Sequence, residues 1–133
     1  MRNSENVFHL AIPCKDLVEA ETFYTLKLGC QLARKYEDRI TLNFFGDQLV
    51  VHFAPSEIDE NPKIYPRHFG ITFNKKSDFE QVYENAKANE IHFFETLKTR
   101  FEGKQEEHLT FFLIDPSNNI LEFKYYHDPR MMY

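Results

Sequence analysis

Two stretches in the second half of the chain, His68-Phe-Gly-Ile71 and Ile120-Leu-Glu122-Phe123, repeat a pattern found in the first half. The corresponding stretches of the first half are His9-Leu-Ala-Ile12 and Val50-Val-His52-Phe53. Each half therefore begins and ends with a strand-like segment that carries a histidine or a glutamate. Self-similarity of this kind indicates a duplicated structural unit.

Both halves predict the element order strand, helix, strand, strand, strand. In the first half, Asp16 is the expected helix cap with Glu19 three residues on, and Gly29 is the expected stop. The expected strands cover residues 7–12, 31–36, 39–45 and 48–53.

In the second half, Ser77 is the expected cap and Asn89 the expected stop of the helix. The expected strands cover residues 68–73, 91–95, 109–114 and 119–126. His9 and His68 are 59 positions apart, whereas His52 and Glu122 are 70 apart. We assign the extra residues to the charged stretch 98–108, which is expected to form a rim or lid of the active site.

The fold class predicted from this pattern is α+β, with two paired βαβββ modules. We expect one domain over residues 1–133, with a first module at about 7–54, a linker at 55–66 and a second module at about 67–127. The linker is rich in proline and acidic residues, which is typical of a loop.

Composition narrows the functional classes. The net charge of −5 and the lack of a basic stripe argue against nucleic-acid binding. No segment approaches about 18 consecutive apolar residues, so no membrane span is expected. With no export signal recognised, Cys14 and Cys30 are interpreted as free thiols of a cytoplasmic protein. The aromatic content of 16% suits packed sheets around a small-molecule cavity.

The four repeated polar residues are candidate metal ligands. Strand alternation places His9, His52, His68 and Glu122 on the face of each strand that points away from the helices. Three imidazoles and one carboxylate suit a first-row divalent ion. Fe, Ni, Zn, Co and Mn all remain open.

The chain resembles the vicinal oxygen chelate superfamily, which comprises glyoxalases, bleomycin resistance proteins and dioxygenases. The resemblance rests on His9-Leu-Ala-Ile12, Phe23-Tyr24 before Leu28-Gly29, His68-Phe-Gly-Ile71 and Asp115-Pro-Ser-Asn-Asn-Ile-Leu-Glu122-Phe123. Asn118 stands where the family usually has glycine, a mild departure because asparagine tolerates a left-handed turn. The similarity covers about residues 7–126.

This resemblance implies a cupped mixed sheet with helices on the outside, and a metal held by the positions of His9, His52, His68 and Glu122. It implies a small-molecule substrate chelated through neighbouring oxygens, and a homodimer. In a lactoylglutathione-lyase-like isomerisation, Glu122 would move a proton and His52 would complete the ligand set or act as a base. In an oxidoreductase of the dioxygenase type, two histidines and Glu122 would bind Fe(II).

Three further residues are candidate substrate contacts. Arg100 could clamp a carboxylate, and Phe44 and Phe112 could line an aromatic cavity. Phe112 stands where ring-cleaving relatives commonly have tyrosine, which counts against catechol cleavage. The alternative to an enzyme is a metal-free protein that sequesters a drug or another small molecule, as bleomycin resistance proteins do. A fosfomycin-modifying activity would need a K⁺-binding loop and several cationic substrate contacts, and the sequence offers no convincing set of them.

Overall fold

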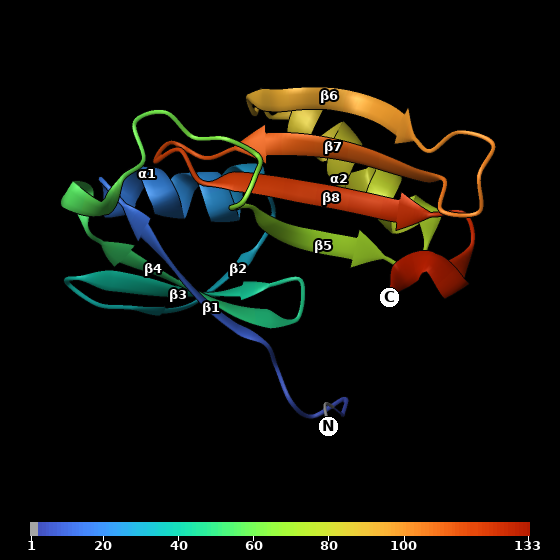
Figure 1. The fold of residues 1–133 in the computed structure, drawn as a ribbon. Helices are drawn as coiled ribbons and strands as arrows, with labels where there is room; N and C mark the ends of the chain where they lie inside the picture. The colour runs from blue at the N-terminus through green and yellow to red at the C-terminus, as the bar shows by residue number, and fades with distance from the viewer. Residues whose placement is uncertain (1–2) are drawn as a thin grey trace. The chain divides into compact units, whose positions relative to one another are not determined.

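The computed structural model describes residues 3–133, and the chain divides into two compact units. The first unit contains the chain up to residue 60 together with 116–119, and the second contains residues 61–115 and 120–133. Each unit holds one four-stranded sheet, with strand order β1-β4-β3-β2 in the first and β5-β8-β7-β6 in the second (Figure 1). This arrangement confirms the predicted α+β fold of paired βαβββ modules.

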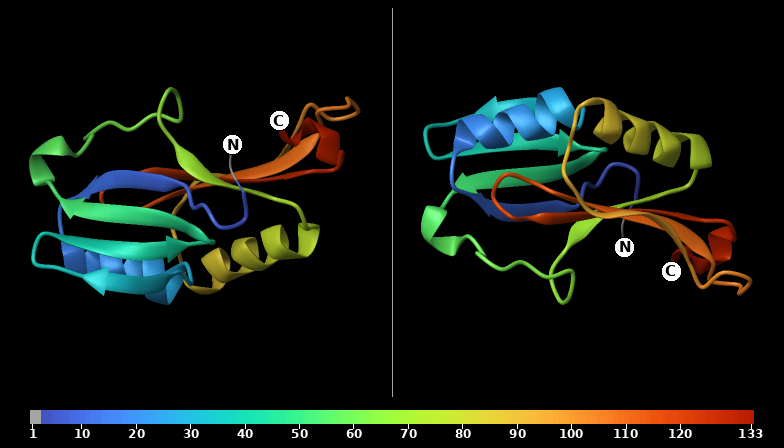
Figure 2. Two further views of the ribbon diagram at one scale, coloured as in Figure 1. Left: turned by 90° about the horizontal axis from the view of Figure 1, so that it is seen from below. Right: turned by 90° about the horizontal axis from the view of Figure 1, so that it is seen from above.

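The first unit follows the predicted order of elements. They are β1 (His9–Cys14), α1 (Leu17–Glu21), the π-helical segment η1 (Thr22–Lys27), β2 (Gln31–Lys35), β3 (Arg39–Phe44), β4 (Asp47–Phe53) and the short 3-10 helix η2 (Pro55–Glu57). β1 runs parallel to β4, and Figure 2 shows these two strands side by side. β3 is antiparallel to both β4 and β2.

The helical segment of the first unit begins and ends where the sequence predicts. The Asp16 carboxylate accepts a hydrogen bond from the backbone N–H of Glu19 at 2.9 Å, which satisfies one of the free donors of the first turn. Gly29 has a φ of 88°, the left-handed conformation that suits the residue after a helix. Between these two residues, Phe23 and Tyr24 are buried, with exposed fractions of 4% and 0%.

The second unit repeats the order with a longer helix. Its elements are β5 (Phe69–Phe73), α2 (Lys76–Ala88), β6 (Phe93–Arg100), β7 (His108–Ile114), β8 (Ile120–Tyr126) and the 3-10 helix η3 (Pro129–Met132). α2 covers one face of the sheet through an aromatic cluster (Figure 1). In this cluster Phe79 of α2 packs on Phe111, and Phe111 stacks on Phe123 with ring centroids 5.3 Å apart.

Two predictions for the second unit were wrong in detail. Lys75, not Ser77, is the N-cap of α2, and the Ser77 hydroxyl donates to the neighbouring Asp78 carboxylate instead. Asp78 lies in the first turn, where a negative charge favours the helix dipole. The strand expected at residues 91–95 is longer than predicted, because β6 spans Phe93–Arg100 and stays paired with β7 through Arg100. Ladder pairing satisfies the backbone donors that a loop would leave to water.

Residues 116–119, which lie within the Asp115-Pro-Ser-Asn-Asn motif, belong to the first unit and hydrogen-bond to its backbone. Ser117 Oγ accepts from the Lys15 N–H, and Asn119 Nδ2 donates to the Pro13 carbonyl, each at 2.9 Å. Asn118 has a φ of 64°, which confirms the expected left-handed turn. Within residues 3–133, no helix combines the length and the apolar character needed to cross a membrane.

Candidate functional site

The face of the second sheet that is turned away from α2 carries the polar residues of the site. Phe111 and Phe123 point toward α2, so strand alternation places their neighbours on the opposite face. Glu122 is paired with Gly70 of β5 and with Phe112 of β7 on this face. A few polar groups among apolar and aromatic neighbours are typical of a small-molecule site.

His68 and Glu122 meet directly in the second unit. His68 Nε2 lies 3.0 Å from Glu122 Oε2, and His68 Nδ1 lies 2.7 Å from the Ile64 carbonyl oxygen. Because a carbonyl can only accept, Nδ1 carries the proton in this bond. In the neutral ring, the lone pair of Nε2 therefore faces a carboxylate oxygen. A proton or a metal cation between the two atoms removes this repulsion.

Glu122 is buried, with an exposed fraction of 7%, and its two oxygens have different partners. Thr110 Oγ1 donates to Oε1 at 2.8 Å, which fixes the carboxylate plane. Lys124 Nζ lies 3.7 Å from Oε2, beyond hydrogen-bond range but close enough for an ion pair. A buried carboxylate is costly without such partners, so its presence here indicates a specific task.

The donor set of this pair fits a divalent cation. An imidazole nitrogen and a carboxylate oxygen are both ligands of first-row metals, at about 2.0–2.2 Å from the ion. Two such ligands at right angles around one ion lie about 3 Å apart, which agrees with the 3.0 Å between Nε2 and Oε2. The Ile64 carbonyl and the Thr110 hydroxyl orient the two ligands in the way that metal sites require.

The pair alone is an incomplete ligand set. Among residues 3–133, no three or more His, Cys, Asp or Glu side chains gather as a group that could hold a metal ion. A metal ion bound by this pair would need further ligands from other groups, from substrate or from water.

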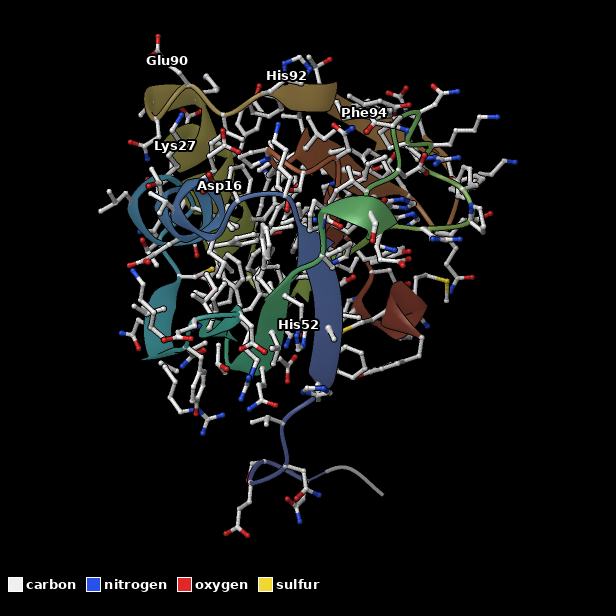
Figure 3. The ribbon with its side chains drawn as sticks, turned by 90° about the vertical axis from the view of Figure 1, so that its left-hand side faces the viewer. Asp16, Lys27, His52, Glu90, His92 and Phe94 are labelled. Atoms are coloured by element: carbon white, nitrogen blue, oxygen red, sulfur yellow. The ribbon has the colours of Figure 1, made fainter. Side chains whose placement is uncertain are left out.

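In the first unit, the strand register separates His9 from His52. His9 lies opposite Gln48, whereas His52 lies opposite Pro13 on one side and Arg39 on the other. His52 is thus four positions further along β4 than the partner of His9, or about 13 Å. Figure 3 shows His52 on β4 beside β1. Two side chains that stand on one sheet face at this spacing do not converge on a single ion.

The same register identifies the residue of the first unit that corresponds to Glu122. Glu122 pairs with Gly70, two positions after His68, and Ala11, two positions after His9, pairs with Val50. Val50, not His52, therefore occupies the place of Glu122. The structure brings His68 and Glu122 together and does not bring His9 and His52 together.

His9 has an orienting partner of its own. Its Nδ1 lies 2.6 Å from Gln48 Oε1, an amide oxygen that can only accept, so Nδ1 donates and Nε2 is left as the basic nitrogen. His9 is exposed in the first unit. Its ring is thereby prepared to bind a cation through Nε2.

The three candidate substrate contacts differ in their surroundings. Phe44 is 4% exposed and alternates with the buried Ile40 and Leu42, so it is a core residue of the first unit. Phe112 is 1% exposed and meets the His68 ring edge to face at 5.6 Å, so it positions His68.

Arg100 lies near the pair in the second unit. Its Nη1 donates to the Tyr65 hydroxyl at 3.1 Å, and the Tyr65 ring contacts the His68 ring at 5.9 Å. The hydrogen bond to Tyr65, with a smaller contribution from the charge of Glu122, raises the pKa of the Arg100 guanidinium. Arg100 therefore remains cationic in the electrostatic field of Glu122.

Sequence reasoning missed four side chains of these arrangements: Gln48, Tyr65, Thr110 and Lys124. Lys124 could have been found, because it follows Glu122 by two positions and must share its face of the strand. Gln48 and Thr110 depend on cross-strand register, which alternation does not give.

Comparison with known proteins agrees with the fold and the motifs. The family model described as the Glyoxalase/Bleomycin resistance protein/Dioxygenase superfamily matches residues 6–123. The chain belongs to this superfamily. No curated protein sequence matches the chain.

Solved structures share the whole fold. A glyoxalase/bleomycin resistance protein/dioxygenase from Alicyclobacillus acidocaldarius is 62% identical, covers 100% of both chains and has a TM-score of 0.96. The fosfomycin resistance protein FosX from Listeria monocytogenes is 13% identical over 96% of this chain and 98% of that chain, with a TM-score of 0.72. Lactoylglutathione lyase from Agrobacterium tumefaciens is 20% identical over 90% and 92% of the two chains, with a TM-score of 0.68. The last two similarities show the fold alone.

Proposed function

We propose that this protein is a metal-dependent enzyme that acts on a small molecule chelated to the ion through neighbouring oxygen atoms. His68 and Glu122 are two of the ligands, and His9 is the third. The observation that carries the proposal is the 3.0 Å approach of His68 Nε2 to Glu122 Oε2, with Nδ1 committed to the Ile64 carbonyl.

His9 enters this ligand set on the family resemblance and on the hydrogen bond of its Nδ1 to Gln48. Val50 occupies the place that corresponds to Glu122, so the first unit offers one ligand where the second offers two. Two histidines and one carboxylate form the triad typical of non-haem Fe(II) enzymes that activate oxygen. A set of three protein ligands therefore supports dioxygenase chemistry over an isomerisation that uses four protein ligands.

When bound, the ion would polarise the substrate oxygens and stabilise negative charge on them. The residues of the chain would do the rest. Thr110 holds Oε1 of Glu122, so Oε2 is the oxygen that would bind the ion. Phe112 packs against His68 and keeps water from one side of the ring.

A metal-free binding protein is the second candidate. Its support is the ion pair between Lys124 and Glu122, which compensates the buried carboxylate without a metal.

Elemental analysis of the purified protein decides between the two. We expect about one first-row metal per chain, retained on dialysis, and loss of the metal in a His68→Ala, Glu122→Ala double variant. Lys87→Gln, on the solvent side of α2, is the control that should keep the metal. Iron would support the dioxygenase, and nickel, zinc or cobalt the isomerase. No metal after reconstitution with each of these ions would overturn the enzyme and leave the binding protein.

A further inference from the structure

We propose that Lys124 and Arg100 form a site for a doubly charged oxyanion, of phosphate or phosphonate chemistry, on the substrate. This inference rests on the proposed function, because the oxyanion would lie beside the ion held by His68 and Glu122. All four residues belong to the second unit. The proposal rests on the positions of two cationic side chains, Lys124 and Arg100, which have free hydrogen-bond donors and lie on the same sheet face as the buried Glu122 carboxylate.

Lys124 presents its ammonium group next to the metal-binding pair. It follows Glu122 by two positions on β8 and pairs with Thr110 of β7, so it shares their sheet face. Its Nζ has an ion-pair partner in Glu122 at 3.7 Å and lies 5.9 Å from the Tyr126 ring. Neither contact is a hydrogen bond, so its three N–H donors remain available to a ligand.

Arg100 approaches from β6 and is held in place by Tyr65. One nitrogen, Nη1, donates to the Tyr65 hydroxyl at 3.1 Å, and Tyr65 in turn contacts the His68 ring. A guanidinium has five donors, so most of them are free after this bond. Their planar arrangement suits two oxygens of one phosphate or carboxylate.

Charge balance indicates how negative the ligand should be. Lys98, the other cation of this face, is paired with Glu95 and adds no net charge. With a divalent ion bound, the ion, Lys124 and Arg100 exceed the single charge of Glu122 by three. A neutral substrate would leave this excess of three positive charges uncompensated, which is costly in a partly buried site. A dianionic group offsets most of this excess.

The competing explanation is that Lys124 only neutralises Glu122. On that view, removal of Lys124 would weaken the folded protein and would have no effect on anion binding. The two explanations therefore differ in a measurable property other than activity.

The test is binding of inorganic phosphate to the Mn²⁺-loaded full chain, followed by the paramagnetic relaxation of its ³¹P resonance. Mn²⁺ affinity is measured separately by electron paramagnetic resonance. Lys124→Gln and Arg100→Gln should each weaken phosphate binding about tenfold or more, the size expected when a charged hydrogen bond is lost. Lys124→Arg should retain it, and Lys87→Gln, which makes the same charge change on α2, should not alter it.

Mn²⁺ affinity separates this inference from the proposed function. We expect the Gln variants to keep Mn²⁺, and Lys124→Gln to bind it several-fold more tightly because a nearby positive charge is gone. Mn²⁺ binding with no phosphate binding, or with equal phosphate binding in all variants, would overturn the oxyanion site and leave the metal enzyme intact. Failure of the wild-type protein to bind Mn²⁺ or any other divalent ion would overturn both.

Discussion

His68 Nε2 and Glu122 Oε2 lie 3.0 Å apart, and each side chain is anchored from behind by a different element. Ile64, in the segment before β5, holds the histidine, and Thr110 of β7 holds the glutamate. Hydrogen bonds to residues other than the pair therefore hold His68 Nε2 and Glu122 Oε2 in position. This arrangement is pre-organised for a cation, because neither side chain has to reorient to bind one.

Thr110→Val tests this anchoring. Valine preserves the shape of threonine but removes the hydroxyl that donates to Glu122 Oε1. We expect metal affinity to fall by about 10–100-fold, the usual cost of losing a group that orients a ligand. Competition with a chelator of known affinity measures this. Thr41→Val, at a buried threonine of the first unit, is the matched control and should leave metal affinity unchanged. Equal losses in both variants would mean that threonine burial, and not the bond, matters.

His9→Ala and His52→Ala should have different effects on metal content. His52 lies four positions beyond Gln48, the residue opposite His9, and Val50 occupies the place of Glu122. We expect His52→Ala to retain a full equivalent of metal and His9→Ala to lose most of it. Elemental analysis of both variants, prepared in parallel, gives the answer. Metal loss in His52→Ala would instead favour a four-ligand set.

His9 and His52 also show which features of the site can be predicted from the sequence and which cannot. The internal repeat predicted the number and order of strands, and alternation correctly placed Glu122 and His68 on one sheet face. Alternation has a period of two, however, and gives no position along a strand. His52 satisfies the face criterion, but the hydrogen bonds between β1 and β4 set His9 opposite Gln48, four positions before His52.

The length of β6 was misjudged for a related reason. We expected this strand to end at residue 95, but a β-hairpin can be lengthened with polar residues when one face is exposed to solvent. Lys98 and Arg100 continue β6 in register with Thr110 and His108. The sequence showed the extra residues, but not that they extend two paired strands.

Gly70→Ala should disrupt the second unit. Gly70 pairs with Glu122 in the parallel ladder of β5 and β8, and a Cβ at this position would lie 1.7 Å from the Glu122 carbonyl oxygen. Such a contact forces the two strands apart, and with them the His68–Glu122 pair. We expect a loss of about 3 kcal/mol or more in the free energy of unfolding, measured by urea denaturation. Gly103→Asn is the control, because a Cβ at that turn meets nothing within 4 Å and asparagine tolerates its φ of 77°. A stable Gly70→Ala protein with native metal affinity would contradict the close approach.

The buried thiol of Cys30 should make stability depend on alkaline pH. Burial raises the pKa of this thiol from 9.0 to about 12, so the folded state favours the neutral form. The resulting stability is fully present below pH 9 and is lost as the pH rises from 9 toward 12. Between pH 8 and pH 10.5, the wild-type protein should lose about 1–2 kcal/mol more unfolding free energy than Cys30→Ala, because only the wild type has this group to ionise. Urea denaturation of both proteins at the two pH values measures the difference.

Alkylation provides an independent test of the same burial. Iodoacetamide at pH 8 should leave Cys30 and the fully buried Cys14 unmodified until the protein is unfolded. Rapid alkylation of Cys30 in the native protein, or identical pH dependence of the two proteins, would contradict the buried, neutral thiol.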